Sequence, residues 1–209
     1  MTGRLDALLK EVRACRMCAG YLPLGPRPVL SVSPPARILI IGQAPGTRVH
    51  ETGIPWNDPS GERLRQWMVV DRETFYDASR IAIMPMGLCY PGRLARGGDA
   101  PPRKECAPAW HARVRAELPD VELTLLVGSY AQAFYLHGVR KLTMTGTVRA
   151  FREYLPDYLP LPHPSWRTTG WLRRNPWFET DVLPELRARV VTLLAPTPQR
   201  RGRPRAPRS

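Results

Sequence analysis

The sequence predicts an α/β fold, a three-layer α/β/α sandwich around a mainly parallel sheet of four strands. Three short runs of branched apolar residues, at 37–41, 80–84 and 122–127, have the length and composition of buried parallel strands. Each run is followed by a turn and then a helical pattern, and this alternation is typical of parallel sheets. A fourth strand is predicted at 158–161, just before a loop rich in proline and tryptophan.

The helices follow from the spacing of apolar residues between these strands. Near the N-terminus, one helical face carries Leu5, Leu8, Leu9 and Val12. Further helices are predicted at 62–70, 109–117, 129–137 and 178–194. In open parallel sheets, ligands bind in the loops that leave the carboxyl ends of the strands. We therefore expect the functional residues in those loops.

The chain divides into one folded domain, residues 1–195, and a basic tail, residues 196–209. The tail combines five arginines with four prolines and has no aromatic residue, so it is not expected to bury enough surface to fold. Within it, Arg201-Gly202-Arg203-Pro204 resembles the core of an AT-hook, which inserts arginine into a narrow A·T minor groove. A generic tail that adds non-specific DNA affinity is the alternative.

The net charge of +13 favours a polyanionic partner, because basic proteins bind nucleic acid through long-range attraction and counterion release. A merely solvated basic surface is the alternative. No apolar run approaches the roughly 20 residues that cross a bilayer. The N-terminus also lacks the apolar stretch of a signal peptide. We expect a cytoplasmic protein that associates with the bacterial nucleoid through DNA and has no membrane partner.

The chain contains four cysteines, of which Cys15 and Cys18 form a C-x-x-C pair and Cys89 and Cys106 lie far downstream. Four thiolates suit either zinc or an iron–sulfur cluster, and the spacings do not choose between them. Four incidental buried cysteines are a further possibility. A redox pair is less favoured because this C-x-x-C follows a helix instead of opening one, and disulfides are not expected in the cytoplasm.

Two sequence motifs stand in the loops where ligands are expected. Gly42-Gln43-Ala44-Pro45-Gly46 directly follows the first strand and leads to Thr52-Gly53-Ile54-Pro55-Trp56; Leu161-Pro162-His163-Pro164-Ser165-Trp166-Arg167 follows the fourth. Over about residues 5–195, the chain resembles the uracil-DNA glycosylase superfamily. With its cysteines it is similar to the iron–sulfur branch, usually called family 4.

The resemblance extends to the contexts of the third and fourth cysteines, in Cys89-Tyr90-Pro91-Gly92-Arg93 and Pro102-Arg103-Lys104-Glu105-Cys106. It implies a four-iron, four-sulfur cluster on Cys15, Cys18, Cys89 and Cys106, with a structural role. Zinc is the less favoured occupant.

The resemblance also implies roles in the chemistry. Enzymes that excise a base first extrude it from the helix into a pocket. Trp56 stands at the stacking position of the family. His163 would donate a hydrogen bond to uracil O2 as charge builds on the leaving base. Ser165 would contact a phosphate, and Trp166 or Arg167 would fill the gap in the duplex.

The sequence departs from the family pattern at three positions. Gln43 stands where family 4 has a carboxylate, and Ala44 stands where the best-known branch has aspartate. Asp58 is therefore expected to stabilise water or the cationic sugar, with a helix-capping role as the alternative. Pro85 replaces the asparagine that reads uracil, so Asn57 or backbone groups, including Gly42, are expected to bind the base.

The resemblance, carried by these residues, predicts a monofunctional glycosylase that hydrolyses the N-glycosidic bond of uracil in DNA and starts base-excision repair. Its partner would be DNA containing uracil or abasic sites, bound by a monomer. No lysine occupies a Schiff-base position, so lyase activity is not expected. Two alternatives stay open: a non-catalytic or product-holding DNA-binding protein of the same fold, and a glycosylase for another deaminated base such as hypoxanthine.

Overall fold

The computed structural model describes residues 2–95 and 97–195. Its centre is a four-stranded sheet in the order β2-β1-β3-β4, in which every neighbouring pair is parallel. The strands are β1 (Ile38–Ile41), β2 (Ile81–Ile83), β3 (Leu123–Val127) and β4 (Tyr158–Leu161). This architecture confirms the predicted α/β fold. The tail at 196–209, with its AT-hook-like segment, lies outside the described residues.

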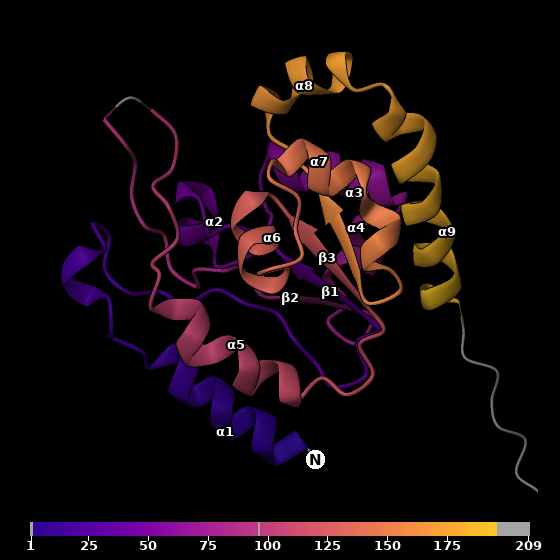
Figure 1. The fold of residues 1–209 in the computed structure, drawn as a ribbon. Helices are drawn as coiled ribbons and strands as arrows, with labels where there is room; N and C mark the ends of the chain where they lie inside the picture. Colours follow the sequence, from indigo (N-terminus) through magenta and orange to yellow (C-terminus); the bar gives the residue numbers. More distant parts are fainter. Residues whose placement is uncertain (1, 96, 196–209) are drawn as a thin grey trace, which may run out of the picture.

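Helices cover both faces of the sheet and complete the three layers (Figure 1). One face packs against α1 (Thr2–Arg13), α5 (Cys106–Ala116) and α6 (Ser129–Tyr135). The other packs against α3 (Pro59–Met68), α7 (Met144–Arg149) and α9 (Leu183–Leu194). Shorter elements are α2 (Thr47–Thr52), α4 (Arg72–Tyr76), α8 (Thr169–Arg174), three 3-10 turns at Ala19–Tyr21, Phe151–Tyr154 and Trp166–Thr168, and a π turn at Phe178–Val182.

Alternation along the strands divides the apolar core into two layers. In β1, Leu39 and Ile41 join the α1/α5/α6 layer, whereas Ile38 and Ile40 join the α3/α7/α9 layer. All four side chains are fully buried. Burial on both faces explains why this strand is a continuous apolar run with no polar alternation.

Most predicted helices are present, with shifted ends. The apolar face of α1 is buried as predicted. Helix α3 starts three residues before the predicted 62, because Asp58 caps it and Pro59 takes the first helical position. The predicted helix at 178–194 is divided into the π turn and α9.

Within the part of the chain that the structure describes, no helix combines the length and apolar character needed to cross a bilayer.

Candidate active site

A pocket of about 560 Å³ opens at the carboxyl ends of the strands, where the sequence predicted it. Its walls come from the loops after β1, β2 and β4 and from the segment that leads into α3. Ten of the predicted site residues line it: Gly42, Gln43, Ala44, Trp56, Asp58, Pro85, His163, Ser165, Trp166 and Arg167. Residues separated by more than 120 positions in the sequence are thus brought to one cavity.

Trp56 and His163 lie together in this pocket, with ring centroids 5.6 Å apart and ring planes inclined by 31°. Gly42 makes this position possible, because a Cβ there would lie 2.7 Å from the Trp56 indole. Trp56 itself has φ 57°, a left-handed conformation that costs energy for a bulky residue. The backbone therefore holds the indole directly above the first motif.

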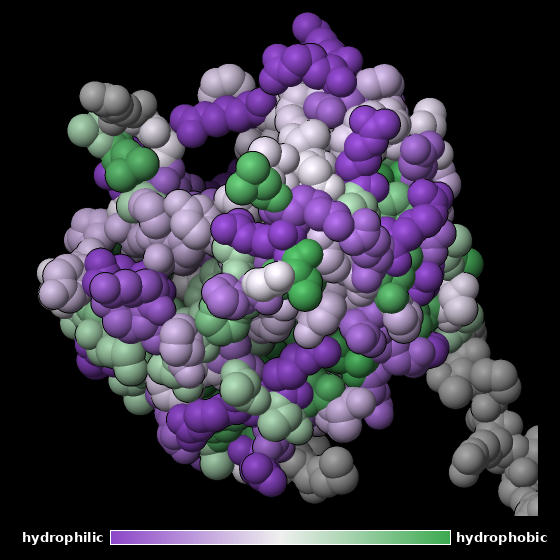
Figure 2. Space-filling model, viewed as in Figure 1, coloured by the Kyte–Doolittle hydropathy of each residue, from purple (hydrophilic) through white to green (hydrophobic). Residues whose placement is uncertain are grey.

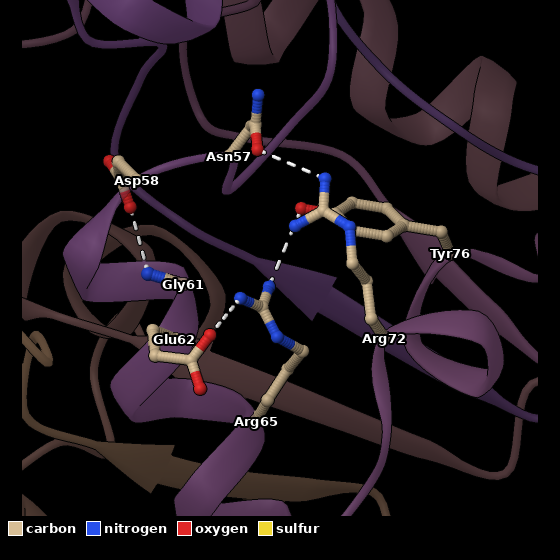
Figure 3. Close-up of polar contacts among 7 residues, drawn as sticks. All are labelled: Asn57, Asp58, Gly61, Glu62, Arg65, Arg72 and Tyr76. Carbon is tan, nitrogen blue, oxygen red and sulfur yellow. Dashed lines mark hydrogen bonds and ion pairs between the residues drawn. The ribbon is translucent and has the colours of Figure 1, made fainter.

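The turn after Trp56 is fixed by Asp58, whose Oδ1 accepts a hydrogen bond of 2.8 Å from the Gly61 amide (Figure 3). Asp58 therefore has the capping role that was one alternative from the sequence. It also lines the pocket, as the other alternative, stabilisation of water or the cationic sugar, requires. Asn57 differs: its Oδ1 accepts a hydrogen bond of 3.1 Å from Arg72, and it is not among the residues that line the pocket. The structure does not bring Asn57 to this pocket, so the expectation that it binds the base is not supported.

The imidazole of His163 lies at the pocket wall beside the turn that follows β3. Gly128 in this turn has φ 89°, a conformation that favours glycine. Burial lowers the pKa of His163, and the nearby Asp58 carboxylate only partly opposes this shift. His163 is therefore neutral at pH 7, with one ring N–H available as a donor.

The segment after His163 forms the mouth of the pocket. Arg63, from α3, donates a hydrogen bond of 2.8 Å to the Ser165 carbonyl and so anchors the segment. Trp166 is 76% exposed, and the Arg167 guanidinium lies 5.5 Å from the centre of its ring. A large indole in water beside a cationic side chain has the chemical character of a nucleic-acid contact.

One wall of the pocket was not predicted from the sequence. It comes from the loop between Cys89 and Cys106. It brings Arg93, Gly97, Gly98 and Asp99 to the pocket. The loop forms a narrow hairpin that projects from the body at the upper left of Figure 1. Figure 2 shows a hollow between this hairpin and the hydrophilic side chains at the top of the molecule. Three glycines in nine residues, 92, 97 and 98, were the available signal for a tight hairpin.

Pro85, which by the resemblance replaces a base-reading asparagine, accepts a hydrogen bond from a buried histidine. His111 Nε2 donates to the Pro85 carbonyl at 3.1 Å, and the Tyr135 hydroxyl donates to Nδ1 at 2.7 Å. Because a carbonyl can only accept, the first bond defines the tautomer. His111 is 2% exposed, and burial lowers its pKa to about 4.

This histidine predicts how stability depends on pH. An unfolded histidine has a pKa of about 6.5, so between pH 6.5 and 4 the unfolded chain binds one more proton at this position than the native chain. Stability contributed by neutral His111 is complete above pH 6.5 and is lost as the pH falls towards 4, by at most about 1.4 kcal/mol per pH unit. Urea unfolding at several pH values should show a shallower pH slope for His111→Gln. The same substitution at exposed His137 should leave the slope unchanged, and equal slopes for all three proteins would contradict the assignment.

The four cysteines converge on a second, much smaller cavity of about 20 Å³. It is lined by Cys15, Cys18, Cys89 and Cys106 together with Leu22, Pro26, Pro28, Gly87, Leu88, Arg103 and Trp110. All four cysteines are free thiols. Burial raises the pKa of Cys89 to about 11 and that of Cys106 to about 12. Within the described residues, no group of three or more His, Cys, Asp or Glu side chains is arranged to hold a metal ion.

The donors around this cavity nevertheless have the chemistry that an iron–sulfur cluster requires. The cavity offers four thiols, largely apolar walls and an amide donor to sulfur. The Leu88 amide donates to Cys106 Sγ at 3.3 Å, and the cationic Arg103 lines the same cavity. The residue types present therefore suit the group that the resemblance implies.

A known protein family matches most of this chain. The model of the uracil DNA glycosylase superfamily matches residues 31–187, from just before β1 to helix α9. The chain therefore belongs to the uracil DNA glycosylase superfamily. Among solved structures, the chain is similar to an NMR structure of a candidate uracil DNA glycosylase from Methanosarcina acetivorans. The two are 15% identical, the match covers 78% of this chain and 94% of that chain, and the TM-score is 0.46.

Proposed function

We propose that this protein is a monofunctional DNA glycosylase that hydrolyses the N-glycosidic bond of uracil in DNA. The observation that carries the proposal is the joint position of Trp56 and His163, with ring centroids 5.6 Å apart in one pocket. An indole supplies a stacking platform for a flipped base, and a neutral imidazole supplies a donor for its carbonyl oxygen. Membership of the superfamily supports the reaction class.

In the proposed reaction, the extruded uracil stacks on Trp56 while the C1′–N1 bond lengthens. The bonding electron pair moves to the base, and negative charge grows on O2. The neutral imidazole of His163 hydrogen-bonds O2 more strongly as this charge develops, which lowers the barrier. Water then forms a bond to C1′, one of its protons passes to the departing base or to solvent, and an abasic site is left.

The pocket mouth has the charge expected for a DNA surface. Arg93 and Arg167 line it, and Arg173 and Arg174 are exposed on the adjacent helix α8. Figure 2 shows hydrophilic side chains gathered at this end of the molecule. Arginines here would contact phosphates on either side of the flipped nucleotide. Trp166, exposed at the rim, would enter the duplex in place of the missing base.

A four-iron, four-sulfur cluster on Cys15, Cys18, Cys89 and Cys106 is part of the proposal. When bound, it would supply a covalent cross-link among distant segments. Cys89 and Cys106 lie at the two ends of the loop that carries Arg93 and Asp99 to the pocket. The segment just before Cys89 is also bonded to the first motif, since the Gly87 amide donates to the Gln43 carbonyl at 2.9 Å. The cysteines would thus clamp the ends of a pocket wall.

Iron analysis tests this assignment. Protein purified without oxygen should contain about four irons and four acid-labile sulfides per chain and absorb visible light. Cys106→Ser should lower the iron content and the midpoint of thermal unfolding. Stoichiometric zinc in a colourless preparation, or neither metal in a stable and active protein, would contradict the cluster.

Strand scission tests the proposed function. The purified protein is incubated with single- and double-stranded oligonucleotides that contain one uracil, and alkali then cleaves any abasic site. Scission at the uracil only after alkali is the expected result, since no lyase step is proposed. An absence of scission at stoichiometric protein on both substrates would overturn the enzyme assignment. If an oligonucleotide with hypoxanthine is cut and one with uracil is not, the substrate is hypoxanthine.

A further inference from the structure

The hairpin at 92–100 is closed by backbone contacts that place its last residues at the pocket. The Leu94 amide donates to the Gly98 carbonyl at 2.9 Å, and the Ala100 amide donates to the Gly92 carbonyl at 2.8 Å. Arg93 and Asp99 form an antiparallel bridge between the two arms. The position of Asp99 is therefore set by the hairpin rather than by a free loop.

The Asp99 carboxylate lies against the first motif. Its Oδ2 is 3.5 Å from the position that a Cβ on Gly46 would occupy. One residue further, the Ala100 carbonyl accepts a hydrogen bond of 3.3 Å from Gln43 Nε2. An amide at position 43 can donate this bond, whereas an ionised carboxylate cannot. Gln43 therefore helps to hold a different carboxylate at the pocket.

Asp58 and Asp99 are the two carboxylates among the described residues that line the pocket, and their surroundings differ. Asp58 Oδ1 is already bonded to the Gly61 amide. Asp99 is an exposed residue of the hairpin, yet partial desolvation at the pocket raises its pKa, an effect that Asp58 reinforces and that Arg93 and Arg167 oppose. A carboxylate with a raised pKa is a better proton acceptor than an ordinary surface aspartate.

We propose that Asp99 is the catalytic carboxylate of this site, which accepts a proton from the attacking water during hydrolysis of the glycosidic bond. This inference rests on the proposed function. The water oxygen bonds to C1′ as the C1′–N1 bond breaks and its electron pair leaves with the base. One water proton passes to Asp99 and later to the departing base or solvent. The negative charge of Asp99 also stabilises the cationic sugar before water adds.

Single-turnover excision of uracil by Asp99→Asn tests the inference, with Glu51→Gln as the matched control. Glu51 is an exposed carboxylate on α2 that does not line the pocket. Asp99→Asn should slow release by about 100-fold or more, the usual contribution of a positioned acid or base. Glu51→Gln should release uracil at the wild-type rate.

Binding separates a catalytic role from a structural one. A duplex with 2′-fluoro-2′-deoxyuridine, whose glycosidic bond resists cleavage, should bind Asp99→Asn as tightly as wild type. Lost binding would overturn the catalytic role, and so would a wild-type excision rate in Asp99→Asn. Loss of excision in Asp58→Asn alone would transfer the role to Asp58. A wild-type protein that releases no base would instead defeat the proposed function itself.

Discussion

His163→Ala is expected to slow uracil release by about 100- to 1,000-fold, the usual cost of removing one donor to a developing anion. The neutral imidazole lies 5.6 Å from the Trp56 indole, centroid to centroid, so it can reach the edge of a base stacked there. The hydrogen bond from His163 stabilises the transition state more than the ground state. The loss should therefore appear in the single-turnover rate, with little change in affinity for the 2′-fluoro duplex.

His137→Ala is the control for this prediction, because His137 is exposed and lies outside the pocket lining. It should keep the wild-type rate. Excision by His163→Ala at the wild-type rate would remove the imidazole from the mechanism and leave the base anion without its proposed donor.

Gly61→Ala is expected to damage both stability and activity. A Cβ at Gly61 would lie 1.8 Å from the Trp56 carbonyl oxygen and 2.9 Å from the Trp56 Cβ. Backbone atoms cannot move aside as a flexible side chain can, so the start of α3 must shift away from Trp56. Overpacking of this kind costs about 3 kcal/mol. The shift would also weaken the bond from the Gly61 amide to Asp58 and displace the indole.

Urea unfolding and single-turnover excision should both record the effect of Gly61→Ala. Excision should slow by at least about 10-fold, because a displaced Trp56 indole would misplace the stacked base. The matched control is Gly170→Ala in the exposed helix α8, where the nearest atom to an added Cβ is Arg174 Nη1 at 3.9 Å. Alanine has a higher helix propensity than glycine, so this variant should be as stable as wild type or slightly more stable. A Gly61→Ala protein with wild-type stability and rate would contradict the described turn.

The sheet and the pocket were predictable because their signals are local. A run such as 37–41, apolar at nearly every position, indicates a strand buried on both faces. The carboxyl ends of parallel strands must meet at one edge of the sheet. It follows that the motifs at 42–46 and 161–167 had to lie near each other, whatever their separation in sequence.

The remaining parts of the site depend on contacts that no local pattern encodes. Asp99 reaches the pocket through a nine-residue hairpin and a bond from Gln43 to the Ala100 carbonyl. Asn57 is directed to Arg72, on a five-residue helix that was too short to be predicted from periodicity. Side chains placed by tertiary contacts of this kind can be identified only once the fold is known.

The free base released from a uracil-containing duplex, measured by mass spectrometry under single-turnover conditions, tests the central claim most directly. The pocket that holds Trp56 and His163 predicts one free uracil per substrate strand, with every other base retained. If wild-type protein binds the duplex and no free uracil appears, then this pocket does not cleave the glycosidic bond of uracil.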